Sequence, residues 1–274
     1  MSILLTNRGS LIFFCLLISQ IFFGQIGCVP DKLPFISGEE LIYDVEYHMG
    51  NTWVSAAKAR FIVKDSTYNN NPCYYLEGKG RTLKSYDWFF KVRDKYASFI
   101  STKDYKPIHF IRRVREGDFY LNYDYDFDYK NRKAFIEEKR KNIARQDTMD
   151  LIPCSYDILS SVYFSRAIDF KKLNKGDTIP IDIILDKEMF SDIGIIYNGT
   201  KVIKDQQQRK IECIHFEIEL IEGTIFKGNE TMDVYVTNDE NKIPIYVEAE
   251  ILVGSIRVYI KSIKNSKRPL TYIP

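Results

Sequence analysis

Alternation of apolar and polar residues over long segments is the feature of this sequence that most restricts its fold. Between Phe119 and Lys130, one set of alternate residues reads Phe, Leu, Tyr, Tyr, Phe and Tyr, and the other reads Tyr, Asn, Asp, Asp, Asp and Lys. A period of two held this long is typical of a strand with one buried and one solvated face. We therefore expect a chain built mainly from strands.

The same pattern recurs along most of the chain. It predicts further strands at 40–47, 53–63, 73–80, 88–99, 107–114, 178–185, 195–203, 213–220, 232–237, 243–252 and 255–263. Turn-forming runs such as Asn69-Asn70-Asn71-Pro72 separate them. One segment differs, because Asp157 is suited to cap a helix and the apolar residues after it recur at helical spacing. We expect one helix over about 157–170.

These elements define the fold class. We predict a mainly β protein made of a single antiparallel, strongly curled sheet of about eleven to thirteen strands. The sheet would form an incomplete or flattened barrel, and the helix would cover one face or plug one end. The β domain would span 38–264, followed by a tail over 265–274.

Two parts of the chain resemble each other. Residues 63–65 (Val-Lys-Asp) precede Cys73 by the same distance as residues 203–205 (Ile-Lys-Asp) precede Cys213. The likeness favours two matched halves, although unrelated hairpins can share such features. The halves would cover about 38–150 and 172–264.

The N-terminal segment resembles an export signal. Arg8 precedes an apolar run over 11–23, which small residues and Cys28 follow. The run is about 13 residues long, shorter than the roughly 20 that span a bilayer. We expect a signal peptide over 1–27, a lipid-modified Cys28 and a tether over 28–37. Plain cleavage near Gln25 is the alternative, because lipoproteins usually carry an aliphatic residue there.

The expected location follows from this segment. The protein would be a membrane-anchored lipoprotein of the cell envelope, and otherwise periplasmic or secreted. Val29 after the cysteine is not the Asp that retains some lipoproteins at the inner membrane, which favours the outer membrane. The 39 Lys and Arg balance 37 Asp and Glu, whereas nucleic-acid binding needs concentrated positive charge. We therefore expect no nucleic-acid partner.

Five cysteines are present. Cys15 lies within the expected signal and Cys28 is the expected lipidation site. Cys73, Cys154 and Cys213 show no metal-binding spacing, and they are either three buried thiols or one disulfide with a free thiol. If the two halves pack around a pseudo-twofold axis, Cys73 and Cys213 are a candidate disulfide pair.

Three aspartates have the spacing of a calcium loop. These are Asp124, Asp126 and Asp128. Counted from Asp124, the sixth position, where a calcium loop needs Gly, holds Tyr129, and the twelfth, where it needs a carboxylate, holds Phe135. Without the sharp turn and the last ligand, the loop cannot close around an ion. We expect a solvated strand face whose charge nearby Lys and Arg residues balance.

No catalytic motif is evident. His48, His109 and His215 do not form a spaced ligand pair, so structural or surface roles are the simplest interpretation. Ser160 and Ser161 lack the G-x-S-x-G turn of a nucleophile, and phosphate and dinucleotide loops are absent from the sequence. We predict that the protein is not an enzyme and uses no metal or cofactor.

Four segments together resemble the bacterial envelope family known as domain of unknown function 3108. They are 38–45 (GEELIYDV), 157–166 (DILSSVYFSR), 236–245 (VTNDENKIPI) and 253–256 (VGSI). The resemblance extends from about Gly38 to Ile260, with a departure over 51–57, where the family more often has a Gly near Ala57. It implies an exported, mostly antiparallel β domain and implies no activity.

Exported curled sheets with a packed helix also resemble half-barrels that carry lipids and lipoproteins, although fold alone does not determine function. By this analogy, Tyr123, Tyr125 and Phe127 would line a cavity for an apolar ligand such as an acyl chain, unless they form a solid core. The predicted function is a non-enzymatic envelope lipoprotein that binds a lipid or a lipidated partner. One alternative is a scaffold module that docks another envelope protein, which an exposed apolar patch would favour. Another is an enzyme acting on glycan or lipid, which facing carboxylates would favour.

Overall fold

The computed structural model describes residues 30, 32–49, 51–88, 90–140, 143–221, 230–252 and 254–274. The expected signal peptide over 1–27 and the expected lipidation site, Cys28, lie outside these residues. In the part of the chain that is described, none of the helices is long and apolar enough to cross a membrane.

One sheet of fifteen strands contains nearly all of the regular structure, in the order β8-β7-β6-β5-β4-β3-β2-β1-β15-β14-β13-β12-β11-β10-β9. The strands are β1 (Glu40–Met49), β2 (Thr52–Tyr68), β3 (Asn71–Thr82), β4 (Arg93–Ser101), β5 (Pro107–Glu116), β6 (Phe119–Asp128), β7 (Lys133–Arg140), β8 (Ile143–Asp150), β9 (Ser155–Asp157), β10 (Thr178–Leu185), β11 (Glu188–Lys204), β12 (Lys210–Glu219), β13 (Thr231–Thr237), β14 (Pro244–Glu250) and β15 (Ser255–Lys264). The helical elements are η1 (Lys84–Tyr86), α1 (Ile158–Ser165) and η2 (Phe170–Lys172).

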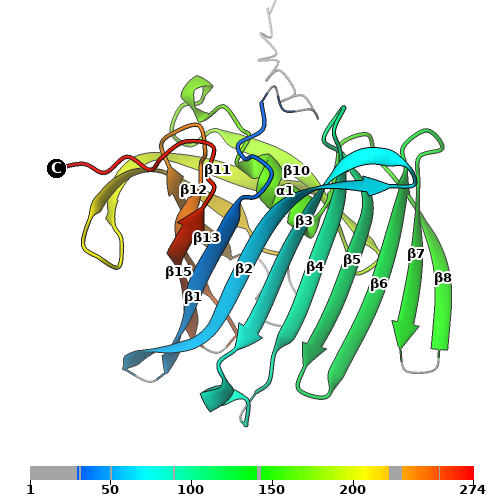
Figure 1. Ribbon diagram of the computed structural model, residues 1–274, viewed down its shortest axis with the longest axis horizontal. Coiled ribbons are helices and arrows are strands. Elements are labelled where there is room, and N and C mark those ends of the chain that lie inside the picture. The colour runs from blue at the N-terminus through cyan, green and yellow to red at the C-terminus, as the bar shows by residue number, and fades with distance from the viewer. Residues whose placement is uncertain are drawn as a thin grey trace, which may run out of the picture.

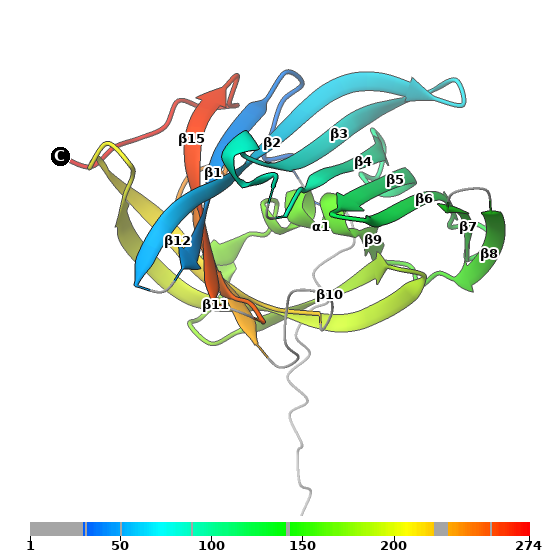
Figure 2. The same ribbon diagram turned by 90° about the horizontal axis from the view of Figure 1, so that it is seen from below.

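The sheet curls around α1 without closing into a barrel (Figures 1 and 2). Strands β8 and β9 are its two ends in hydrogen-bonding order. Strand β9 also contacts β5 from across the interior, so the sheet wraps over itself. The predicted single curled sheet and incomplete barrel are confirmed.

Two details of the predicted sheet were wrong. Fifteen strands are present instead of eleven to thirteen, and β9 pairs in parallel with β10, which makes the sheet mixed and not purely antiparallel. The missed strands are β7, β8 and β9. Strand β8 is exposed along nearly its whole length, and an edge strand with polar residues on both faces shows no alternation. Strand β9 is only three residues long.

The predicted helix is present but shorter than 157–170, because α1 ends at Ser165. Asp157 caps it as expected, since its carboxylate accepts hydrogen bonds from the backbone N–H groups of Leu159 and Ser160, each at 2.9 Å. The Ser98 hydroxyl on β4 donates a further bond of 2.7 Å to this carboxylate. The cap therefore also joins the helix to the sheet.

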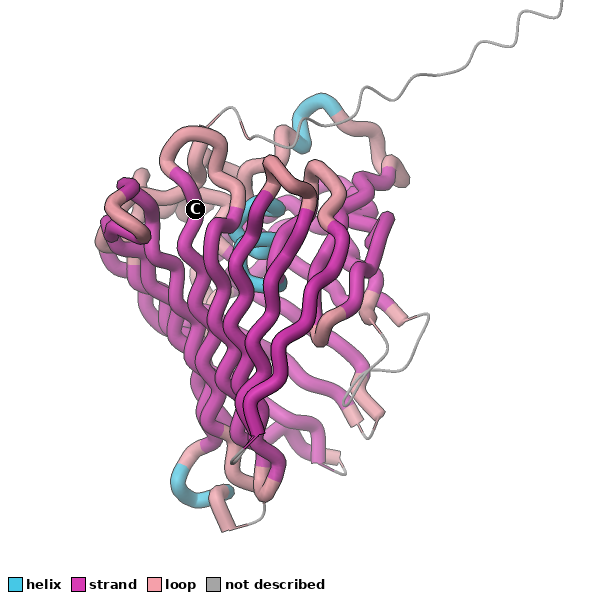
Figure 3. Tube along the Cα trace, turned by 90° about the vertical axis from the view of Figure 1, so that its right-hand side faces the viewer, coloured by secondary structure: helices cyan, strands magenta, loops and turns pink. Residues whose placement is uncertain are grey.

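Helix α1 lies within the curled sheet near one end of the strands (Figure 3). Its Leu159 and Tyr163 belong to a core cluster formed with β2 to β8. Phe164, one residue further along, belongs to a second cluster formed with β10 to β13. Gly78 on β3 permits close approach, because a Cβ there would lie 3.4 Å from Leu159 and 3.1 Å from Phe61. The helix thus divides the concave face into two regions.

A buried ion pair holds this arrangement together. Arg166, just after α1, binds both carboxylate oxygens of Glu39 at 2.7 and 2.9 Å. The side chains are 2% and 0% exposed, respectively. The same guanidinium donates to the backbone carbonyls of Asn241, at 3.0 Å, and Pro34, at 3.3 Å. One side chain therefore joins the segment before β1, the end of α1 and the turn between β13 and β14.

We expect Arg166→Met to lower the free energy of unfolding by about 3–5 kcal/mol, because it leaves the Glu39 carboxylate buried without its partner. The double variant Glu39→Leu with Arg166→Met should lose less than the sum of the two single variants. Urea unfolding followed by tryptophan fluorescence measures both effects.

Arg60→Met is the control, because Arg60 pairs with Glu40 at 2.7 Å while its side chain is 44% exposed. This change should cost less than about 1 kcal/mol. Equal losses for the Arg60 and Arg166 variants would contradict the central role of the buried pair.

Cys73 and Cys213 are buried free thiols. They lie on β3 and β12, with β2, β1, β15, β14 and β13 between them in the sheet. The candidate pairing of these two residues is therefore not formed. Cys154 is disulfide-bonded, so the alternative of three free thiols is also wrong.

Candidate functional site

The three aromatic residues expected to line a cavity lie in a packed core. Tyr123, Tyr125 and Phe127 are 6%, 1% and 9% exposed and belong to the cluster that includes α1. The Tyr125 ring centroid lies 5.5 Å from that of Phe110 on the neighbouring strand and 5.7 Å from that of Tyr123. Because these three side chains are almost completely covered by other protein atoms, no room is left for a ligand beside Tyr125. The structure matches the alternative of a solid core at these positions.

The hairpin between β10 and β11 reinforces this filled region. Asp186 pairs with Arg112 on β5. Lys187 binds Glu138 on β7 at 2.6 Å, and its ammonium lies 5.6 Å from the Tyr123 ring centroid. These contacts hold the hairpin over β5 to β7. This half of the concave face is covered by the protein itself.

The other half carries apolar side chains that the protein covers only in part. We define the concave apolar band as six half-buried residues on β13, β14, β15, β1 and β2, which are Met232, Val247, Ile256, Val258, Val45 and Ala57.

Strand register makes the band continuous. Val258 pairs with both Val247 and Val45, and Val45 pairs with Ala57. Val247 in turn pairs with Val234, which is buried in the second core cluster with Phe164. Paired residues on neighbouring strands share a face. The band is therefore the continuation of the core surface beyond the residues that bury it.

Small residues leave open space beside the band. Ala59 pairs with Gly80, and Gly80 pairs with Asp94. A Cβ placed on Gly80 would meet no atom within 4 Å. Ala57 and Ala59 are two residues apart on β2 and so point to the same face. Side chains are thus shortest where the band meets β3.

Asp94 is the carboxylate at this margin. Burial raises the pKa of Asp94 to about 6, although the backbone N–H of Arg115 donates a hydrogen bond to it at 3.0 Å. The folded protein therefore holds this proton more tightly than the unfolded chain, in which an Asp pKa is about 3.9. The protonated Asp94 therefore contributes to the free energy of unfolding fully below about pH 3.9, and this contribution is lost as the pH rises through 6.

We expect Asp94→Asn to raise the free energy of unfolding at pH 7.5 by about 1 kcal/mol, a value reduced from the full pKa displacement by solvent screening. At pH 4 the same change should have almost no effect. Thermal unfolding from pH 4 to 8 measures this difference. Asp118→Asn, in the exposed turn after β5, is the control and should show no such trend. A benefit of Asp94→Asn that is equal at both pH values would contradict the argument.

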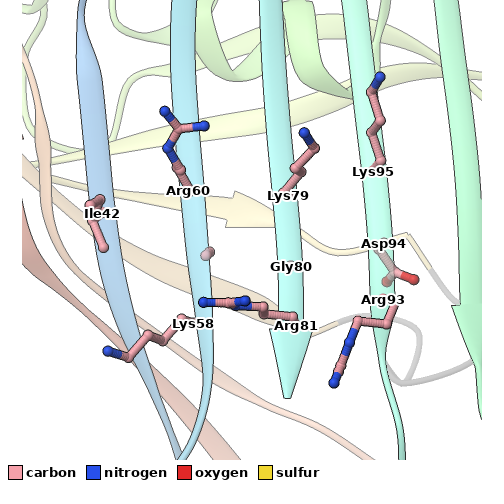
Figure 4. A pocket seen from close by; sticks show the side chains of 10 residues that line it. Ile42, Lys58, Arg60, Lys79, Gly80, Arg81, Arg93, Asp94 and Lys95 are labelled. Carbon is pink, nitrogen blue, oxygen red and sulfur yellow. The ribbon is translucent and has the colours of Figure 1, made fainter. Parts of the chain in front are cut away.

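A charged pocket of about 610 Å³ lies on the outer face of the same strands (Figure 4). Six cationic side chains form two rows across β2, β3 and β4. One row contains Arg60, Lys79 and Lys95, and the other contains Lys58, Arg81 and Arg93. Gly78, adjacent to Lys79 on β3, faces α1, and its cross-strand partner on β4 is Tyr96, which is adjacent to Lys95. Adjacent residues of a strand point to opposite faces, so the cations point away from the helix.

Most of these cations are neutralised by nearby carboxylates. Glu77 binds Lys79 at 2.8 Å and Lys95 at 3.4 Å, and Asp87 binds Arg93 at 2.6 Å. Glu40 binds Arg60 at 2.7 Å, and Asp44 lies 3.9 Å from Lys58. Arg81 forms no ion pair with any residue that the structure describes. Exposed pairs of this kind add little stability. The pocket is a charged outer surface of low net charge, so it is a weaker candidate for ligand binding than the concave band.

The histidines do not converge. His48 on β1 stacks on Trp53, with ring centroids 4.8 Å apart. His109 lies on β5 and His215 on β12, each beside a different aspartate. The described residues therefore bring no two of the three histidines to one site.

The three aspartates of β6 each have a partner. Arg113 binds both carboxylate oxygens of Asp124, at 2.7 and 2.8 Å. Asp126 accepts a bond of 2.6 Å from the Tyr68 hydroxyl, and Asp128 accepts one of 3.0 Å from the backbone N–H of Asn131. His109 also lies beside two of them, 2.8 Å from Asp126 and 3.9 Å from Asp124. Arg113 balances the charge of Asp124, as expected for a strand face with a basic residue on the neighbouring strand.

Comparison with known proteins identifies the family. The family described as "Protein of unknown function (DUF3108)" matches residues 42–261, and the chain belongs to it. A search of curated proteins found no match.

A solved structure supports the fold. It is the crystal structure of a beta-barrel-like protein of domain of unknown function DUF1849 from Brucella abortus. The TM-score is 0.56 at 8% sequence identity, over 86% of this chain and 100% of that chain. At this identity the likeness concerns the fold alone. It agrees with the curled, barrel-like sheet described above.

Proposed function

We propose that this protein is a non-enzymatic binding protein of the cell envelope that holds the acyl part of a lipid or lipidated partner against the concave apolar band. The observation that carries the proposal is that the band continues the buried core surface yet remains partly exposed to solvent. Apolar surface left in water costs about 25 cal/mol per Å², so covering it with an acyl chain is favourable.

The shape of the sheet suits such a ligand. The open space at Gly80 and the small side chains at Ala57 and Ala59 give an acyl chain room to lie along the strands. Ligand sites in proteins are concave and mainly apolar, with few polar groups, and Asp94 is such a polar group at the margin. The wall of the proposed site therefore differs from the expected Tyr123, Tyr125 and Phe127, which fill the core.

We expect Gly80→Leu to lower the amount of bound acyl ligand at least tenfold, because the new side chain would occupy the open space. Arg81→Leu, one residue away on the opposite face, is the matched control and should bind as the wild type does. Native mass spectrometry of the mature chain, followed by organic extraction, detects the native ligand. Titration with a fluorescent fatty acid measures affinity.

Absence of an acyl adduct together with no saturable fatty-acid binding would overturn the proposal. Equal losses in the Gly80 and Arg81 variants would do the same, because they would show that binding does not depend on the concave face. Thermal unfolding of both variants establishes that they are folded.

The proposal includes export and a lipid anchor at Cys28. It is supported by the positive end, the short apolar run and the Gly-Cys pair at the N-terminus. Two or three acyl chains on one cysteine would make the attachment effectively permanent. The outer membrane is the favoured location, because Val29 follows the cysteine.

We expect Cys28→Ser to move the protein from the membrane fraction to the soluble envelope fraction and to abolish metabolic labelling with an alkyne fatty acid. Cys15→Ser, within the expected signal, is the control and should leave both unchanged. Peptide mass spectrometry identifies the state of Cys28 directly. An unmodified Cys28, or one linked by a disulfide to Cys154, would contradict lipidation.

A docking role is the second candidate, favoured by a group of exposed aromatic residues. Phe119 and Tyr120 begin β6, and Phe90 packs beside Gly117 in the turn before it. These rings and Trp88 are between 43% and 83% exposed. The turn lies at the lower end of the sheet in Figure 1, opposite the segment that leads into β1. A chain anchored through that segment would present the aromatic end away from its membrane, as a scaffold module requires.

A further inference from the structure

A histidine and two carboxylates meet on the outer face of β12 and β13. The ligand atoms of His215, Glu217 and Asp233 all lie within 4.8 Å of one another. His215 Nε2 lies 2.5 Å from Asp233 Oδ1. From this geometry we infer that the three side chains form a binding site for a divalent metal ion, with Zn²⁺ as the preferred ion.

Strand geometry explains the convergence. His215 and Glu217 are two residues apart on β12 and therefore point to the same face. Asp233 on β13 is the cross-strand partner of Glu217, and partners of this kind have Cβ atoms about 5 Å apart. Two positions on one strand and one on its neighbour thus present three ligand atoms to a single point.

The ligand set determines the type of ion. One imidazole nitrogen and two carboxylate oxygens are ligands that Zn²⁺ accepts, and an all-oxygen set would instead suit Mg²⁺ or Ca²⁺. Three protein ligands leave a fourth tetrahedral position for water or for an external ligand. His215 and Asp233 are 18% and 44% exposed, so an ion has access from solvent.

Neighbouring groups hold the ligands in place. Asn198 donates to Glu217 Oε1 at 2.7 Å, and Thr231 donates to Oε2 at 3.1 Å. The His215 ring stacks on Tyr235, with ring centroids 4.3 Å apart and an angle of 8° between the planes. Contacts that orient metal ligands typically contribute a further ten- to hundred-fold to metal affinity.

A second histidine and aspartate, His109 on β5 and Asp126 on β6, lie close together but do not form a comparable metal site. His109 lies 2.8 Å from Asp126, but the second carboxylate, Asp124, is bound on both oxygens by Arg113. The Arg113 guanidinium thus already supplies the positive charge that a metal ion would bring to this carboxylate. The Tyr68 hydroxyl also donates to Asp126. His109 is therefore a matched control for His215.

The test is calorimetric titration of the EDTA-treated, tag-free mature chain with Zn²⁺. We expect one ion per chain with a micromolar dissociation constant, and a visible absorption band when Co²⁺ replaces Zn²⁺. Separate His215→Ala and Asp233→Asn variants should each weaken Zn²⁺ binding at least tenfold. His109→Ala should bind as the wild type does.

Thermal unfolding separates binding from folding. Zn²⁺ in excess should raise the melting temperature of the wild type and of His109→Ala, because an ion that binds only the folded state stabilises it. His215→Ala should melt as the wild type does without metal and should gain nothing from Zn²⁺. Absence of saturable binding at 100 μM Zn²⁺, or unchanged binding by His215→Ala, would overturn the inference. Failure of the acyl-ligand experiment would leave it unaffected, since the two sites lie on opposite faces of the sheet.

Discussion

The buried ion pair between Glu39 and Arg166 is the interaction on which the rest of the structure depends. It connects the entrance to β1 with the end of α1, and through Asn241 it also reaches the turn between β13 and β14. A charged pair away from water is stable only when its hydrogen-bonding capacity is met, and the carbonyls of Pro34 and Asn241 meet that of Arg166. The position of α1 inside the sheet is set in this way.

That position divides the concave face into two regions with different properties. On one side, α1 and the hairpin between β10 and β11 bury Tyr123 and Tyr125 in a solid core. On the other side, the band around Val45 and Val258 remains partly exposed to solvent. One curled sheet therefore contains both its own core and a surface suited to an external apolar ligand. The proposed metal site at His215 lies on the opposite face of the sheet, on β12 and β13, so the two sites are chemically independent.

Membership of the family places the chain among proteins of unknown function, and the likeness to the DUF1849 structure concerns the fold. Function must therefore be argued from sites. The concave band is the stronger basis for the main role, because it is continuous across strands from both ends of the chain. The cationic pocket around Arg81 is a weaker basis, because carboxylates pair with five of the six cationic side chains that line it and leave little net charge.

The sequence by itself determined the local structure. Alternation predicted twelve of the strands, and Asp157 predicted the start of α1, because both signals depend on neighbouring residues. Strand β8 escaped prediction, since an exposed edge strand needs no apolar face. Only the tertiary structure decided that Tyr125 is core, that Val45 lies beside Val258, and that Asp233 meets His215. These outcomes depend on strand order and register between distant segments, which no local pattern encodes.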